Sequence, residues 1–142
     1  MDEEAYRQLF FTSIVHPCPF ERSILTHCAD CSQAEKHYIA EREIVACDDG
    51  ASLEHCVMFR EALRNNFSFA LGKLHIDVPL PHAQEMRMQC GGLKALQFMQ
   101  DGSDEILDIA GLLQLAQKKF GSIADYPYSK IVQFAMRQYK SR

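Results

Sequence analysis

Apolar residues in the second half of the chain recur every three to four positions, which is the spacing of one face of an α-helix. The first such run predicts a helix over residues 53–71, with Gly72 as its stop. A second helix is expected over Ala83–Met99, and the low helix propensity of glycine predicts an interruption or bend at Gly91-Gly92. Between these helices, Leu74–Leu80 resembles a short extended piece.

The clearest helical signal runs from Asp104 to Phe120. Ser103 is a suitable N-cap, acidic residues fill the first turn, lysines fill the last turn and Gly121 follows, so each end suits the helix dipole. Apolar residues cover much of its circumference, which predicts a central core element or part of a partner interface. Pro127 opens a last helix, whose inward-facing residues are expected to be Tyr128, Ile131, Val132, Ala135 and Tyr139.

These elements predict an all-α protein with a single compact helical domain over residues 1–142. Residues 1–57 are expected to form an irregular, cysteine-rich, metal-binding part, and residues 58–142 a helical body. A length of 142 residues with 47% hydrophobic content fits one globular domain. The net charge of -4 lacks the basic field on which non-specific nucleic-acid binding depends, so nucleic acid is not expected as a partner.

The first residues are acidic and show no signal peptide, and the apolar stretch Leu9-Phe10-Phe11 is too short for a secretory or membrane-spanning segment. Disulfides persist mainly in oxidising compartments. We therefore expect a cytoplasmic protein with reduced thiols and no membrane association.

Six cysteines are the one compositional excess, and five of them precede residue 57. Cys28 and Cys31 are spaced so that both thiolates can bind one metal or one edge of a cluster. Cys18 lies between two prolines, which favour extended geometry. Cys47 lies in a turn-like stretch and is expected to be the fourth ligand. Cys56 lies on the apolar face of the following helix. It is expected to be the fourth ligand if Cys47 is too far from the others.

The spacing of these cysteines also bears on the metal. Structural zinc sites usually combine two chelating pairs, and this chain has one. An iron–sulfur cluster accepts thiolates from irregular spacings because each iron needs one protein sulfur. The favoured cofactor is therefore a [4Fe-4S] cluster. Zinc is the alternative, and a protein without a metal is the third possibility.

Histidines near these cysteines could replace a thiolate, but a surface role is expected for His16, His27 and His55. His37 is expected in a helix without a special role. A separate candidate is Cys90, which precedes two glycines and follows His82 by eight residues. It could act as a nucleophile or redox thiol with His82 as base, although a buried structural cysteine is the preferred reading.

Motifs of nucleotide-binding loops, serine hydrolases and zinc proteases do not occur in the chain. We therefore expect an iron–sulfur protein in electron transfer, redox sensing or service to a larger enzyme, with a protein as its partner. An accessory protein is favoured over a stand-alone enzyme. The alternatives are a zinc-stabilised interaction module and a thiol enzyme that uses Cys90.

Overall fold

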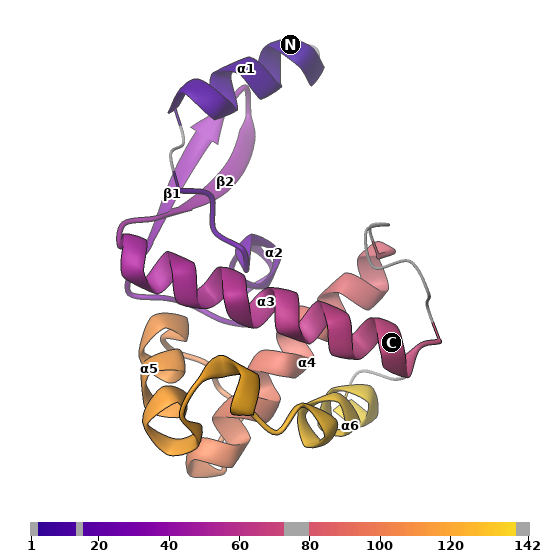
Figure 1. The fold of residues 1–142 in the computed structure, drawn as a ribbon. Coiled ribbons are helices and arrows are strands. Elements are labelled where there is room, and N and C mark those ends of the chain that lie inside the picture. Colours follow the sequence, from indigo (N-terminus) through magenta and orange to yellow (C-terminus); the bar gives the residue numbers. More distant parts are fainter. Residues whose placement is uncertain (1–2, 14–15, 73–79, 139–142) are drawn as a thin grey trace.

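The computed structural model describes residues 3–13, 16–72 and 80–138, and within these ranges the chain is a mostly helical single domain with one β-hairpin (Figure 1). The strands are β1 (Ala34–Ile39) and β2 (Arg42–Cys47). The helices are α1 (Glu3–Ser13), α2 (Glu21–Leu25), α3 (Gly50–Ala70), α4 (His82–Asp101), α5 (Ile109–Phe120), the short 3-10 helix η1 (Ile123–Asp125) and α6 (Tyr128–Gln138). The hairpin corrects the expected all-α class.

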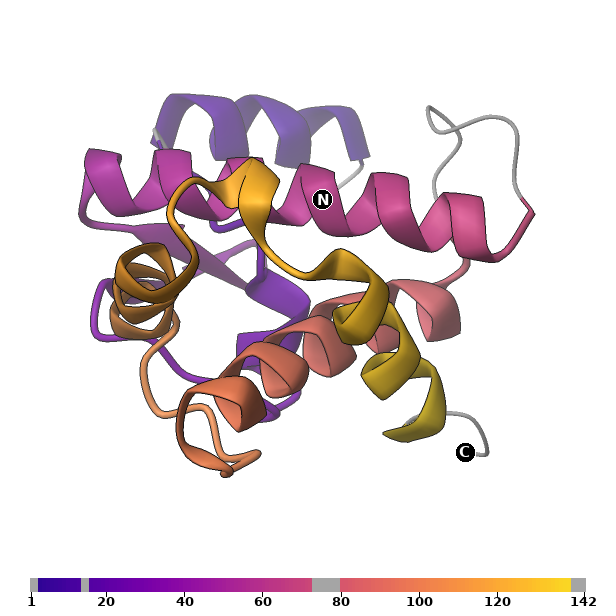
Figure 2. The ribbon, with the colours of Figure 1, turned by 60° about the horizontal axis from the view of Figure 1, so that its bottom comes forward.

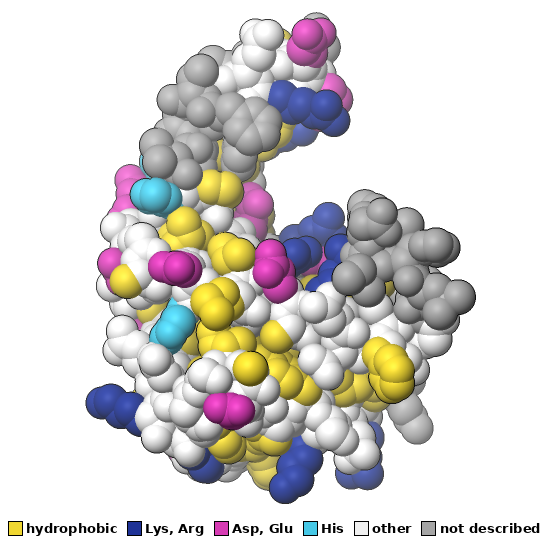
Figure 3. Space-filling view, viewed as in Figure 1, with side chains coloured by type: hydrophobic (Ala, Val, Ile, Leu, Met, Phe, Trp, Pro, Cys, Tyr) yellow, Lys and Arg dark blue, Asp and Glu magenta, His cyan; other side chains and the backbone are white. Residues whose placement is uncertain are grey.

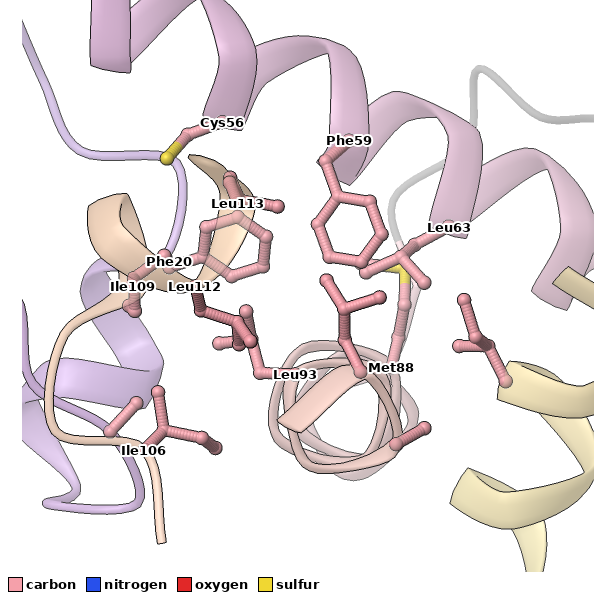
Figure 4. Packing of buried hydrophobic residues seen from close by; sticks show 14 of the residues in the cluster. Phe20, Cys56, Phe59, Leu63, Met88, Leu93, Ile106, Ile109, Leu112 and Leu113 are labelled. Atoms are coloured by element: carbon pink, nitrogen blue, oxygen red, sulfur yellow. The ribbon is translucent and has the colours of Figure 1, made fainter. Parts of the chain in front are cut away.

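Helix α4 lies at the centre of the helical body, beneath α3 and between α5 and α6 (Figure 2). Its side chains Met88, Leu93 and Leu96 are fully buried. They pack with Phe59 and Leu63 of α3 in one hydrophobic cluster (Figure 4). Full burial of one such side chain contributes roughly 1.5–3 kcal/mol, so this cluster holds α3 and α4 together.

Two glycines in α4 do not interrupt it, contrary to the interruption or bend expected there. The backbone stays helical through both. A Cβ atom on Gly92 would lie 2.8 Å from Cδ1 of Leu63, so the missing side chain allows α3 to approach α4 closely. The glycine therefore serves helix packing and not a helix break.

The hairpin pairs β1 with β2 in antiparallel register, with Ala34 opposite Cys47 and Ile39 opposite Arg42. Its two turn residues, Ala40 and Glu41, have φ values of +53° and +68°. Such turns usually carry glycine or asparagine, so the sequence lacked the usual hairpin signal. His37, expected in a helix, lies in β1, and Cys47, expected in a turn, ends β2.

Helix α1 packs on the hairpin, and together they project from the helical body (Figure 1). Tyr6 of α1 packs against a small apolar cluster of the hairpin, and the Arg42 guanidinium lies 4.1 Å from the centre of the Tyr6 ring. Arg42 also forms an ion pair with Glu3. The space-filling view shows a hollow between this arm and the body (Figure 3).

The helix expected from Asp104 begins only at Ile109. The preceding segment pairs instead with the loop before β1: the Asp30 amide donates to the Ile106 carbonyl at 3.0 Å, and the Ile109 amide donates to the Asp30 carbonyl at 2.9 Å. This pairing holds residues 103–108 outside the helix. The helix end at Phe120 and the turn at Gly121 are confirmed.

The last helix begins after Pro127 as predicted, with Ile131, Val132 and Ala135 buried. Tyr139 and nearly all of the expected extended piece at 74–80 lie outside the described residues. Within the described ranges, every helix is too short or too polar to span a lipid bilayer.

Candidate metal centre

Four cysteine side chains line one small cavity at the junction of the hairpin and the helical body. They come from four separate segments: Cys18 before α2, Cys31 before β1, Cys47 at the end of β2 and Cys56 in α3. The remaining lining is mostly apolar. The cavity volume is about 10 Å³, which admits the centre of about one water molecule. The fold therefore gathers thiols that are up to 38 positions apart in the chain (56 minus 18).

Backbone hydrogen bonds fix Cys18 and Cys47 beside each other. The Cys18 amide donates to the Val45 carbonyl at 3.0 Å, and the Cys47 amide donates to the His16 carbonyl at 2.7 Å. The segment before α2 thus runs antiparallel to the end of β2, which is the extended geometry expected of a cysteine between two prolines.

The other two cysteines are held by the helical body. Cys56 is buried and projects from α3 at the margin of the core cluster, on the side of α5 (Figure 4). Cys31 lies in a loop whose next residue, Ser32, donates two hydrogen bonds to Asp108. Burial opposes ionisation of Asp108, but hydrogen bonds from Ser32, from the Gly111 amide and from Cys31 outweigh it and lower its pKa.

Backbone amides donate hydrogen bonds to two of the sulfur atoms. Cys18 receives one from the Phe20 amide, and Cys31 receives two, from the amides of Gln33 and Ala110. Ala110 lies in the first turn of α5, and the first turns of α3 also line the cavity. Helix N-termini carry partial positive charge, which favours the thiolate form, whereas the Asp108 carboxylate beside Cys31 opposes it.

Burial is the main effect on the acidity of these thiols. It raises the pKa of Cys18 to about 12, and it also raises the pKa of Cys31 and of Cys56. Cys56 is affected in addition by Cys18, Cys31 and Cys47, whose negative charges would repel its own. The four thiols are therefore close enough to interact, and a cationic group must be present for them to ionise together.

The four sulfurs do not form a ready-made metal site. Among the residues that the structure describes, no three Cys, His, Asp or Glu side chains form a group that could hold one metal ion as they stand. A zinc–sulfur bond is about 2.3 Å long, whereas a water molecule in contact with a sulfur lies more than about 3 Å from it. The cysteine side chains must therefore move before they can bind one zinc ion, and the cavity must open before it can take the eight atoms of an iron–sulfur cubane.

Cys28, predicted as a ligand together with Cys31, lies elsewhere. Its sulfur is bonded to that of Cys90, so these two thiols depart from the expected reduced state. His27 has a φ of +64°, and this sharp turn after α2 directs Cys28 toward α4. The two cysteines of the C-x2-C motif thus contact different parts of the molecule.

None of the histidines that the structure describes lines the cysteine cavity. His16 and His27 are exposed and His55 is half-buried. His82, considered as a base for Cys90, is exposed and forms a hydrogen bond with Arg22 at 3.3 Å. Cys90 is only 1% exposed and is not a thiol in this structure.

Sequence reasoning missed Asp108, which positions the Cys31 loop against α5. Its only sequence signal is a carboxylate before an apolar helical run, and this is also the pattern of an ordinary N-cap. The chain matches no family model, no curated protein and no solved structure. The chemistry of the four-cysteine cavity is therefore the basis for a functional assignment.

Proposed function

We propose that the protein binds a [4Fe-4S] cluster through Cys18, Cys31, Cys47 and Cys56 and transfers electrons to or from a protein partner. The observation that carries this proposal is the convergence of four thiols from four segments on one mostly apolar cavity. The set keeps three of the ligands favoured from the sequence and takes Cys56 in place of Cys28.

The spacing of the ligands along the chain favours a cluster over a single zinc ion. The four cysteines line a cavity with room for about one water molecule, so it must open further to take a cluster, and as they stand no three of the described ligand-type side chains could hold one ion. In a cubane cluster each thiolate binds a different iron, so its ligands stand farther apart than those of one zinc ion. Irregular ligand spacing in the chain, C-x12-C-x15-C-x8-C, is compatible with the same group.

Electrostatics support the same choice. Four thiolates in a buried cavity repel one another, and bound iron offsets their charge. Amide hydrogens from Phe20, Gln33 and Ala110 point to two of the sulfurs. Hydrogen bonds of this kind to cluster sulfurs tune the reduction potential.

Electron transfer fits the donor set better than substrate catalysis does. With one thiolate for each iron, no iron keeps an open position at which a substrate could bind. Cys18, Cys31 and Cys47 are only half-buried, so a group bound between them lies near the surface, within reach of a docked partner. Bound there, the group supplies one-electron chemistry, and the chain binds it and limits its contact with water.

The decisive experiment is metal and sulfide analysis of protein purified or reconstituted without oxygen. We expect about four iron and four acid-labile sulfide per chain, a broad absorption at about 400 nm and an electron paramagnetic resonance signal after reduction with dithionite. A colourless protein with one zinc per chain would contradict the proposal and favour a zinc-stabilised interaction module.

Matched variants identify the ligands. Cys56→Ala is expected to lose most of the bound iron, because alanine offers no donor atom. The control is the double variant Cys28→Ser with Cys90→Ser, which removes two sulfurs outside the cavity and is expected to keep the iron. The reverse pattern, with circular dichroism showing both variants folded, would exclude Cys56 and restore Cys28 as a ligand.

A further inference from the structure

The disulfide between Cys28 and Cys90 is exposed from one side only. Cys28 is half-buried and lines a second cavity of about 390 Å³, whereas Cys90 lies behind it on α4 and is 1% exposed. Residues from α2, from the loop before β1, from β1, from α4 and from the segment before α5 form the rest of this cavity. Of the two cysteines, Cys28 is therefore the one that a reagent in this cavity can reach.

The loop that carries Cys28 is anchored without the disulfide. The amides of Cys28 and Ala29 both donate to the Ser23 carbonyl, at 3.0 and 3.3 Å. The next residue, Asp30, pairs with Ile106 and Ile109 through backbone hydrogen bonds. Because these bonds do not depend on the S–S bond, reduction leaves the two sulfurs facing each other, as a reversible couple requires.

The interior also has a hydrogen-bond partner for a reduced Cys90. Its sulfur lies 3.6 Å from the hydroxyl oxygen of Ser23, which can accept a hydrogen bond from a thiol. Ser23 is fully buried and is itself held in place, since its hydroxyl donates to Oε1 of Gln89 at 3.0 Å. A thiol at position 90 is therefore satisfied in the folded protein.

Charged groups of both signs line the cavity beside Cys28. Lys36 and Lys94 supply positive charge, and Asp30, Asp104 and Glu105 supply negative charge. The attacking form of a thiol is the anionic thiolate, which the two lysines attract and the three carboxylates repel, so entry depends on the space available and not on a net charge of the cavity. The size of the cavity lies within the range of small-molecule sites.

We propose that Cys28 and Cys90 form a redox-active dithiol/disulfide couple that exchanges with an external dithiol through the sulfur of Cys28. One thiolate of the donor attacks Cys28, the bond between the two cysteine sulfurs breaks, and Cys90 leaves as a thiolate that takes up a proton. The second thiol of the donor then attacks the mixed disulfide and releases Cys28, which is protonated in turn. Two electrons and two protons pass from the donor, which becomes a disulfide. This couple does not depend on a bound cluster.

The first test uses the full chain and two dithiol probes, dithiothreitol and the small Cys-x-x-Cys protein thioredoxin in its reduced form. Acid quenching, alkylation with a mass tag and peptide mass spectrometry follow each cysteine. We expect Cys28 and Cys90 to be reduced together while circular dichroism stays native, and to reform their bond on reoxidation. Reduction by both probes indicates a protein donor, and reduction by dithiothreitol alone indicates a small one.

The second test compares how fast Cys28 and Cys90 each react with an external disulfide. Glutathione disulfide is expected to modify Cys28 in the Cys90→Ser variant at least about tenfold faster than Cys90 in the Cys28→Ser variant, because the exposed sulfur reacts first. Equal rates would overturn the proposal. Two other results overturn it: reduction only at denaturant concentrations that unfold the protein, or two thiols in place of the disulfide after air oxidation.

Discussion

Asp108 accepts two hydrogen bonds from Ser32 on its Oδ1 atom, one from the amide at 2.9 Å and one from the hydroxyl at 3.0 Å. The two residues are 76 positions apart. Ser32 follows Cys31, and Asp108 precedes α5, whose Ala110 amide donates to the Cys31 sulfur. This contact therefore holds one proposed ligand against the helix terminus that stabilises it.

Asp108→Ala is expected to destabilise the metal-free protein by about 1–2 kcal/mol, since a partly exposed carboxylate loses the two hydrogen bonds from Ser32 and those from the Gly111 amide and Cys31. The free energy of unfolding in urea measures this loss. Reconstituted variant protein is also expected to retain less iron, because the Cys31 loop loses its anchor. The control is Asp104→Ala, which removes an exposed carboxylate from the same segment. Equal effects of the two substitutions would contradict the anchoring role.

Glu85 is a buried carboxylate with two partners. Its side chain is 6% exposed, forms an ion pair with Arg60 and accepts a hydrogen bond from Nε2 of Gln89 at 2.9 Å. Removing one member of a buried pair leaves the other charge uncompensated. We expect Glu85→Ala to lower the free energy of unfolding by about 2–4 kcal/mol, as measured by urea denaturation.

An exposed ion pair provides the comparison for Glu85. Lys36 and Glu43 lie 3.9 Å apart on the hairpin, with side chains 45% and 37% exposed. Glu43→Ala is expected to change the free energy of unfolding by less than about 0.5 kcal/mol, since water screens such pairs. If the two substitutions cost the same, burial does not determine the strength of the Glu85 contact.

Much of the fold could be predicted from the sequence, because the apolar spacing of α3, α4 and α6 reflects burial against one another. The beginning of α5 could not, since the pairing of Asp30 with Ile106 is a long-range contact that overrides local propensity. The hairpin could not be predicted either, because its turn residues, Ala40 and Glu41, are not the glycine or asparagine that usually indicate such a turn.

The cysteine set was predictable only in part. Spacing indicated that early cysteines converge, and Cys56 was recognised as inward-facing. The choice between Cys28 and Cys56 as the fourth ligand depended on the turn at His27. This turn directs Cys28 toward α4, where it bonds Cys90. Local spacing contains no information about a partner 62 residues away.

Gly92 tests how closely α3 and α4 pack. Alanine favours helix by about 1 kcal/mol over glycine, but its Cβ would lie 2.8 Å from Leu63, which is fully buried. Overpacking costs about 1–3 kcal/mol, so we expect Gly92→Ala to be destabilising in urea denaturation. The added cost should fall in a Leu63→Ala background. Gly50→Ala, with open space around its Cβ, is the control and is expected not to destabilise.

Removal of the proposed cluster should loosen the cysteine-bearing part and leave the helical body intact. The four thiols join the segment at Cys18, the loop at Cys31 and the end of β2 to α3, whereas α4 and α6 share their own buried contacts. Metal binding and local folding are linked, so chelation of iron is expected to speed amide hydrogen exchange over residues 16–33 and 42–49. Exchange at Leu93 and Ile131 is expected to stay slow. Cys56→Ala should show the same pattern without chelator, and a uniform increase along the chain would contradict a local role.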